Sequence, residues 1–158
     1  MSVDDLFDDV IRRALGEARL QSVPIFTFAF YFDHESSAIS VCIDTEENSL
    51  RTVQRINSYN AKYFQAAVSA GDLPGAAMWQ ANTGRSLSLG DFQLVNLARL
   101  DVDPPDDPPS FFLKMVRAVV RNQGAIEQQS VDPNRLCLCS SGPSDEVELV
   151  WSALPTRG

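Results

Sequence analysis

The sequence predicts a single α+β domain, residues 1–158, in which about three main helices pack with a mostly antiparallel sheet. Two observations lead to this prediction. Apolar residues recur with a helical period in three segments, at 3–18, 45–68 and 108–124. They alternate as in strands in five further segments, at 24–32, 38–43, 91–102, 135–141 and 146–154. The order of these segments favours antiparallel hairpins over repeated parallel crossovers, because crossovers would alternate strands with helices.

The first helix begins after Ser2, which can cap it, and Asp5 three residues later completes a capping box. Its predicted core stripe follows the i, i+3, i+4, i+7 pattern and consists of Val3, Leu6, Phe7, Val10, Ile11, Ala14, Leu15 and Ala18. The next two segments are predicted to form a hairpin around the polar turn DHESS. Its first strand carries a row of four phenylalanines on one face, Phe26, Phe28, Phe30 and Phe32.

Glu46 and Glu47 stand where the second strand gives way to the second helix. Thr45 or Asn48 can cap this helix, and both glutamates then lie favourably against the positive end of the helix dipole. Capping explains much of this motif, while metal binding and partner binding remain alternatives. The helix that follows shows a long apolar pattern, comprising Leu50, Val53, Ile56, Phe64, Ala67 and Val68.

Between Gly71 and Gly90 the sequence predicts an irregular segment with Trp79 as an apolar anchor. A third strand then ends near Val102. The connector DPPDDPP cannot enter a helix interior or a central strand, because proline lacks the backbone donor. Asp107 is expected to cap a third helix that runs until Gly124, and a C-terminal hairpin closes the sheet.

The residue types and motifs of the sequence do not favour a metal site or a catalytic nucleophile. Cys42, Cys137 and Cys139 are predicted to be reduced core residues, and a zinc site lacks ligands because His34 is the single histidine. His34 is also accompanied by no nucleophile motif. A calcium site at the connector is disfavoured by its prolines. We therefore predict no metal, no cofactor and no catalytic residue.

The net charge of −8, from 13 basic and 21 acidic residues, argues against nucleic-acid binding. It suits solubility, and it also suits a partner with a basic surface. The acidic N-terminus does not resemble a signal peptide, and no apolar stretch approaches a membrane span. A cytoplasmic protein without membrane contact is expected.

The segments ISVCIDTEENSL, FQLVNLARLDV and the final hairpin leading to WSALP resemble a family of small bacterial domains of unknown function. Some members occur in polymorphic-toxin neighbourhoods, where immunity proteins are encoded. Family members tend to carry Asn-Thr-Glu-Glu where this chain has Asp44 to Glu47. The resemblance implies a cytoplasmic immunity protein that neutralises a cognate toxin by stoichiometric binding, and it implies no catalytic residue.

The expected partner-binding surface is the acidic connector, because its prolines hold exposed carboxylates on a stiff segment. Its candidate residues are Asp101, Asp103, Asp106 and Asp107, with Glu46 and Glu47 as a weaker second site. Two alternatives remain open. One is a general interaction protein, and the other is a small-molecule sensor or enzyme whose pocket combines the phenylalanine row with the loop around Trp79.

Overall fold

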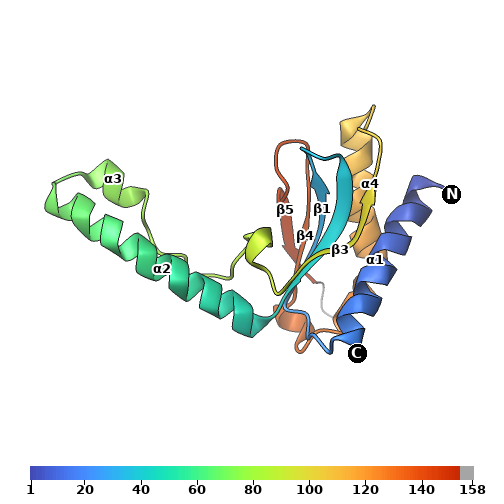
Figure 1. Cartoon of the computed structure of the whole chain (residues 1–158), viewed down its shortest axis with the longest axis horizontal. Coiled ribbons are helices and arrows are strands. Elements are labelled where there is room, and N and C mark those ends of the chain that lie inside the picture. The colour runs from blue at the N-terminus through green and yellow to red at the C-terminus, as the bar shows by residue number, and fades with distance from the viewer. Residues whose placement is uncertain (154–158) are drawn as a thin grey trace.

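A five-stranded sheet forms the centre of the molecule, and the structure, a computed structural model, describes residues 1–153 (Figure 1). The strands are β1 (Thr27–Asp33), β2 (Ala38–Asp44), β3 (Leu94–Asp101), β4 (Cys137–Ser140) and β5 (Leu149–Ser152). They lie in the order β3, β2, β1, β4, β5. All neighbours pair antiparallel except β1 and β4, which run parallel. The predicted α+β domain with a mostly antiparallel sheet is confirmed.

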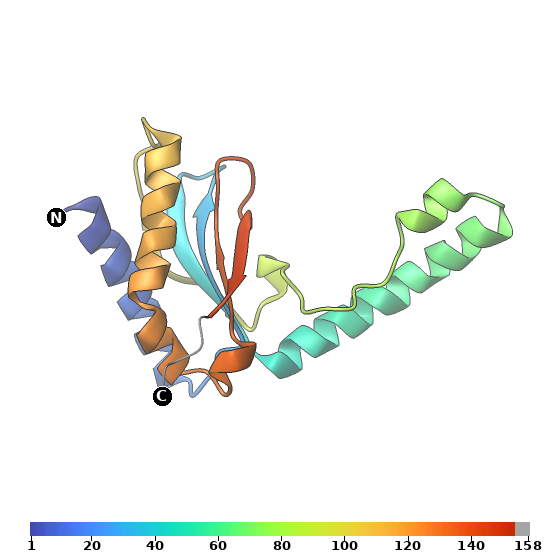
Figure 2. The same ribbon diagram turned by 180° about the vertical axis from the view of Figure 1, so that it is seen from behind.

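Three long helices correspond to the three segments with a helical period: α1 (Val3–Leu20), α2 (Glu46–Ser69) and α4 (Pro108–Arg121). Two short helices, α3 (Leu73–Ala77) and α5 (Gln123–Gln128), and two 3₁₀ turns, η1 (Leu89–Asp91) and η2 (Pro133–Arg135), complete the fold. Helices α1 and α4 lie side by side over one face of the sheet (Figures 1 and 2). None of the helices within residues 1–153 combines the length and apolar character needed to cross a bilayer.

Helix α1 begins as predicted, because the Ser2 hydroxyl accepts a hydrogen bond of 3.1 Å from the backbone N–H of Asp5. Six members of its apolar stripe are buried: Phe7, Val10, Ile11, Ala14, Leu15 and Ala18. Val3 and Leu6, the two members in the first turn, are not buried. The N-terminal end of α1 therefore leaves apolar surface open.

The phenylalanines of β1 form the centre of the core, as their alternation predicts. Phe28 and Phe30 are fully buried, and the Phe30 ring meets that of Phe7 edge to face, with ring centres 5.4 Å apart. Phe26 does not join this row, because it precedes the strand and lies beneath the guanidinium of Arg85, 3.7 Å from the ring centre.

The opposite face of the sheet carries a smaller cluster that contains all three cysteines. Cys42, Cys137 and Cys139 are unpaired and buried beside Tyr31. Leu89 of η1 and Phe92, which follows it, also belong to this cluster, so a short irregular segment takes the place of a covering helix. The predicted core role of the cysteines agrees with this position.

Gly124 does not end the third helix, contrary to expectation. Helix α4 ends at Arg121, and the side chain of its C-cap residue Asn122 donates hydrogen bonds to the Ala118 carbonyl at 2.8 Å and to Asp8 at 2.9 Å. Gly124 lies inside α5, which starts immediately afterwards. Asn122, and not glycine, therefore caps the C-terminal end of α4.

Residues 54–84, which we call the arm, extend away from the sheet (Figures 1 and 2). The arm consists of α2 beyond its first two turns, α3 and the segment that returns to the sheet. Only Ala76 is buried within it. Of the apolar pattern expected for α2, only Val53, near its start, is buried. Helix α2 therefore differs from α1 and α4, since it does not cover the sheet.

Candidate functional site

The connector between β3 and α4 borders an open groove of about 690 Å³. The first turns of α1 and α4 form its other walls. All four aspartates proposed from the sequence line it: Asp101, Asp103, Asp106 and Asp107. We call this depression the acidic groove. The structure thus brings the predicted cluster together around one concave surface.

Local hydrogen bonds and prolines fix the connector in place. The Val102 N–H donates to the Ser37 carbonyl at 3.0 Å, and the Ser37 hydroxyl donates to the Val102 carbonyl at 2.8 Å. At the other end, Asp107 caps α4 by accepting from the Ser110 N–H at 3.4 Å, with Pro108 at the first helical position. The groove wall is therefore anchored at both ends before any partner binds.

The acidic groove has apolar side chains beneath its carboxylates. Val3 and Leu6 of α1, the two residues whose burial was expected but not found, line it together with Phe7 and Phe111. The rings of Phe7 and Phe111 meet edge to face, with centres 5.4 Å apart. A groove with an apolar floor and a charged rim suits a ligand that combines basic and apolar groups.

Negative charge dominates the rim. All four aspartates are exposed, and within residues 1–153 none of them forms an ion pair. Lys114 is the sole basic side chain among the described residues that line the groove. The carboxylates therefore keep their charge available for a partner.

The weaker second site, Glu46 and Glu47, differs from the acidic groove because its carboxylates form ion pairs. Glu46 pairs with Arg135, and Glu47 pairs with Arg51 at 2.7 Å. Thr45 caps α2 as expected by accepting from the Asn48 N–H at 3.1 Å. Because each glutamate has an arginine beside it, this surface presents little net negative charge, although a depression of about 400 Å³ adjoins it.

Asp44 directly precedes Thr45 and the two glutamates. It was not among the candidate site residues, yet it is a fully buried acidic side chain. Its side chain is fully buried, and Oδ1 accepts from the N–H groups of Thr45 and Gln93, both at 3.0 Å, and from the Asn48 amide at 2.8 Å. Burial raises the pKa of Asp44, although these hydrogen bonds act in the opposite direction. Within the described residues its Oδ2 has no hydrogen-bond partner.

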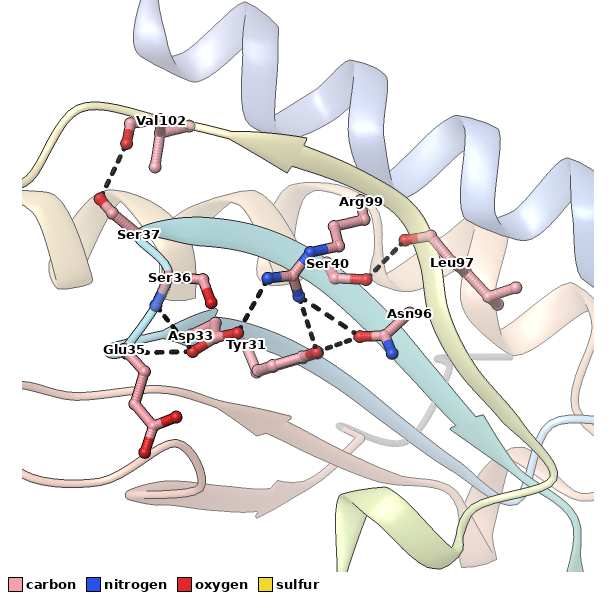
Figure 3. A network of polar contacts seen from close by, with 10 residues as sticks. All are labelled: Tyr31, Asp33, Glu35, Ser36, Ser37, Ser40, Asn96, Leu97, Arg99 and Val102. Carbon is pink, nitrogen blue, oxygen red and sulfur yellow. Dashed lines mark hydrogen bonds and ion pairs between the residues drawn. The ribbon is translucent and has the colours of Figure 1, made fainter.

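A polar network joins β1 to β3 across β2 (Figure 3). Tyr31 donates its hydroxyl hydrogen to Asn96 Oδ1, and Arg99 Nη2 donates to Asp33 Oδ2 at 2.8 Å. Asn96 adopts a left-handed backbone conformation with φ of 54°, next to a register shift between β2 and β3. The turn of the backbone at Asn96 lets its side chain reach Tyr31, which strict strand alternation did not predict.

The pKa shifts of Tyr31 and Asp33 fix the protonation states of these two groups. Burial raises the pKa of Tyr31, so the phenol remains a donor at neutral pH. The hydrogen bond from Arg99 lowers the pKa of Asp33, so the carboxylate remains an acceptor. A group that fixes its protonation state in this way stabilises the edge of the sheet and is poorly suited to proton transfer.

The phenylalanine row and Trp79, proposed together as an alternative small-molecule pocket, are not brought together. Phe28, Phe30 and Phe32 of the row pack in the core, whereas Trp79 lies on the arm, stacked on Tyr63 with ring centres 4.7 Å apart. In the described part of the chain, no three histidine, cysteine or acidic side chains gather as metal ligands would.

The sequence matches no protein-family model, and no curated protein or solved structure shows significant similarity to it.

Proposed function

We propose that this chain is a cytoplasmic bacterial immunity protein, which neutralises a protein toxin by binding it stoichiometrically at the acidic groove. The observation that carries the proposal is the set of four exposed carboxylates, without ion pairs in the described residues, around an apolar floor. The sequence resemblance supports the choice of a toxin as the partner.

The groove defines the chemistry of the partner segment. Lysine or arginine side chains would meet the rim carboxylates, and an apolar side chain between them would reach Phe7 and Phe111. Opposite charges raise the association rate at moderate salt, while the buried apolar contact slows dissociation. The partner is therefore a protein with a basic surface that also projects an apolar anchor.

The rigid connector lowers the cost of binding. Pro104 and Pro105 restrict the backbone between Asp103 and Asp106, so little conformational freedom is lost when a partner contacts these carboxylates. A flexible acidic loop with the same charge would have to be ordered during binding.

The direct test is co-expression of this chain with the toxin encoded beside it in a sensitive cell, together with binding measurements on the purified pair. Changing all four groove aspartates to asparagine removes the charge but keeps the α4 cap, because asparagine caps as well as aspartate. We expect a slower association rate, a weaker salt dependence and reduced protection.

A matched control neutralises four acids outside the groove, namely Asp9, Glu17, Glu35 and Asp145, to the corresponding amides. Both variants change the net charge equally, and they differ in the position of the lost charge and in the exposed Asp9–Arg13 ion pair of 3.8 Å, which the control removes. The control should protect as the wild type does. Full protection by the folded groove variant would move the interface elsewhere, and failure of the wild type to protect would refute the immunity function.

A further inference from the structure

Two of the three thiols lie next to each other on one strand. Cys137 and Cys139 are two positions apart in β4, so both side chains point to the same face of the sheet, and both belong to the buried cluster on that face. Cys139 is fully buried and Cys137 is 8% exposed. Cys42 lies on this face too, but Ala29 of β1 separates it from Cys139, which places these two cysteines about 10 Å apart. We call Cys137 and Cys139 the thiol pair.

The spacing of the thiol pair is too wide for a disulfide and suits a bridging metal ion. A strand rises about 3.3 Å per residue, so the Cβ atoms of the pair are about 6.6 Å apart. A disulfide requires Cβ atoms at about 3.5–4.5 Å, which this strand cannot provide without movement of its backbone. An ion between the two sulfurs adds about 2.3 Å for each metal–sulfur bond and therefore spans the wider gap.

Arg85 supplies a positive charge beside the thiol pair. Its guanidinium donates hydrogen bonds to the Phe26 carbonyl at 2.7 Å and to Thr27 Oγ1 at 3.0 Å, and Thr27 is the register partner of Cys137. Within residues 1–153, Arg85 forms no ion pair with a carboxylate. The neighbouring Cys139 thiol and the charge of Arg85 lower the pKa of Cys137 to about 7. The neighbouring Cys137 and burial raise the pKa of Cys139.

The charges around the thiol pair favour a monovalent ion. A second thiolate beside the first is unfavourable unless a cation lies between them. Two thiolates carry two negative charges, and a monovalent ion together with Arg85 carries two positive ones, so the buried site is neutral. A divalent ion would leave one positive charge in excess, and zinc also requires four donors. Thiolates are preferred ligands of Cu(I).

From these observations we propose that Cys137 and Cys139 form a two-coordinate site for Cu(I), held between the two sulfurs on the face of β4. Both thiols lose their protons to solvent as the ion binds, and neither sulfur nor copper changes its oxidation state. The prediction of no metal from the sequence considered zinc and calcium, whose ligand counts this chain does not meet. Cu(I) is satisfied by two thiolates.

An open hollow of about 450 Å³ between η1 and the segment that leads to β5 gives the ion an entry path. Leu89 and Val147 line this hollow and also pack in the cluster that contains the thiol pair. Val150, the register partner of the fully buried member of the pair, lines it as well. Asp145 and Glu146 are the charged side chains among the described residues that line the hollow, so it attracts cations.

The test titrates the purified and reduced full chain with Cu(I) in the absence of oxygen, against bicinchoninate as a competing coloured chelator. We expect one bound ion per chain, which excess Zn(II) does not displace. Cys137→Ser and Cys139→Ser should each weaken binding at least about 100-fold, because loss of a mere outer partner of a metal ligand already costs about 10–100-fold. Cys42→Ser is the matched control, since it removes a buried thiol of the same cluster and should leave binding unchanged.

Two further measurements do not depend on the stability of the serine variants. Bound Cu(I) should protect Cys137 of the wild type from iodoacetamide. Arg85→Met should weaken binding about tenfold, because the thiolates lose an offsetting charge, whereas Arg85→Lys keeps that charge and should weaken it less. Absence of Cu(I) binding to the wild type, unchanged binding in either serine variant of the thiol pair, displacement by Zn(II), or an equal loss in Cys42→Ser would overturn the proposal.

Discussion

The buried carboxylate of Asp44 accepts a hydrogen bond of 3.0 Å from the backbone N–H of Gln93, 49 residues further along the chain. The same oxygen accepts from Thr45 and Asn48 in the first turn of α2. One atom therefore joins the end of β2, the start of α2 and the segment that returns from the arm. Asp44 fixes the direction in which the arm leaves the sheet.

Removal of this acceptor should destabilise the protein. Asp44→Ala leaves three donors without their partner, and we expect a loss of about 2–4 kcal/mol in the free energy of unfolding. Asp44→Asn retains one carbonyl oxygen for these donors and should cost much less. Denaturant unfolding of both variants measures the difference. Equal stability of the alanine variant and the wild type would show that Asp44 does not hold the arm base.

Asp44 should also make the stability of the protein depend on pH. Because burial raises the pKa of Asp44 above its unfolded value, its ionised form costs stability in the folded state. That cost is present above the folded pKa and disappears as pH falls toward the unfolded value of about 3.9. The stability of the wild type relative to Asp44→Asn should therefore increase as pH is lowered from 7 to 4. A relative decrease over this interval would contradict the assignment.

Phe28 provides a test of the core. It is fully buried in β1, and Phe28→Ala should reduce the free energy of unfolding by about 3–5 kcal/mol. Leu113→Ala is a suitable control, because Leu113 is 48% exposed on α4 and should cost less than about 1 kcal/mol. A change below about 1 kcal/mol at Phe28 would place β1 outside the core.

Ser22 ends α1 in a conformation that glycine would adopt more easily. Its φ is 54°, and the N–H of Val23 donates to the Ala18 carbonyl at 3.1 Å, which is the hydrogen bond of a Schellman motif. Ser22→Gly should raise the free energy of unfolding by about 0.5–1 kcal/mol, whereas Ser22→Val should lower it. Thermal unfolding of both variants measures these changes. A loss of stability in Ser22→Gly would show that the backbone of Ser22 is not strained.

The three thiols should differ in reactivity. The neighbouring Cys139 thiol and the charge of Arg85 lower the pKa of Cys137 to about 7, while burial raises that of Cys42 to about 11. Iodoacetamide should therefore label Cys137 first between pH 7 and 8. Cys139→Ala should shift this labelling to higher pH, and Cys42→Ala should not. Preferential labelling of Cys42 would contradict this order.

Most of the helices and strands around the sheet could be predicted from the sequence, because their buried residues recur with the regular spacing of a helix or a strand. Phe28 and Phe30 alternate in β1, and the stripe of α1 matches its buried face except at Val3 and Leu6. The position of Asp103, Asp106 and Asp107 outside helices and strands could also be predicted, since the prolines beside them exclude regular structure.

The position of the arm could not be predicted in the same way. The apolar period of α2 indicates a helix with one apolar side, but it does not specify whether that side meets the sheet of the same chain or lies exposed. The direction of α2 depends on Asp44 and Gln93, whose contact spans 49 residues. The left-handed backbone conformation of Asn96 could not be predicted either, because the residue spacing in a strand does not reveal where a bulge occurs.

The parallel pairing of β1 with β4 has a consequence for synthesis on the ribosome. Thr27 of β1 is the register partner of Cys137 of β4, so one edge of β1 stays open until the ribosome has made the residues of β4. At about 5–20 residues per second, translation leaves that edge uncovered for on the order of 5–20 s. The antiparallel hairpin of β1 and β2 can form during this interval, while its phenylalanine-rich strand presents unpaired backbone groups to neighbouring nascent chains. The late arrival of β4 therefore makes this strand edge the place where chaperone binding or misassembly would begin.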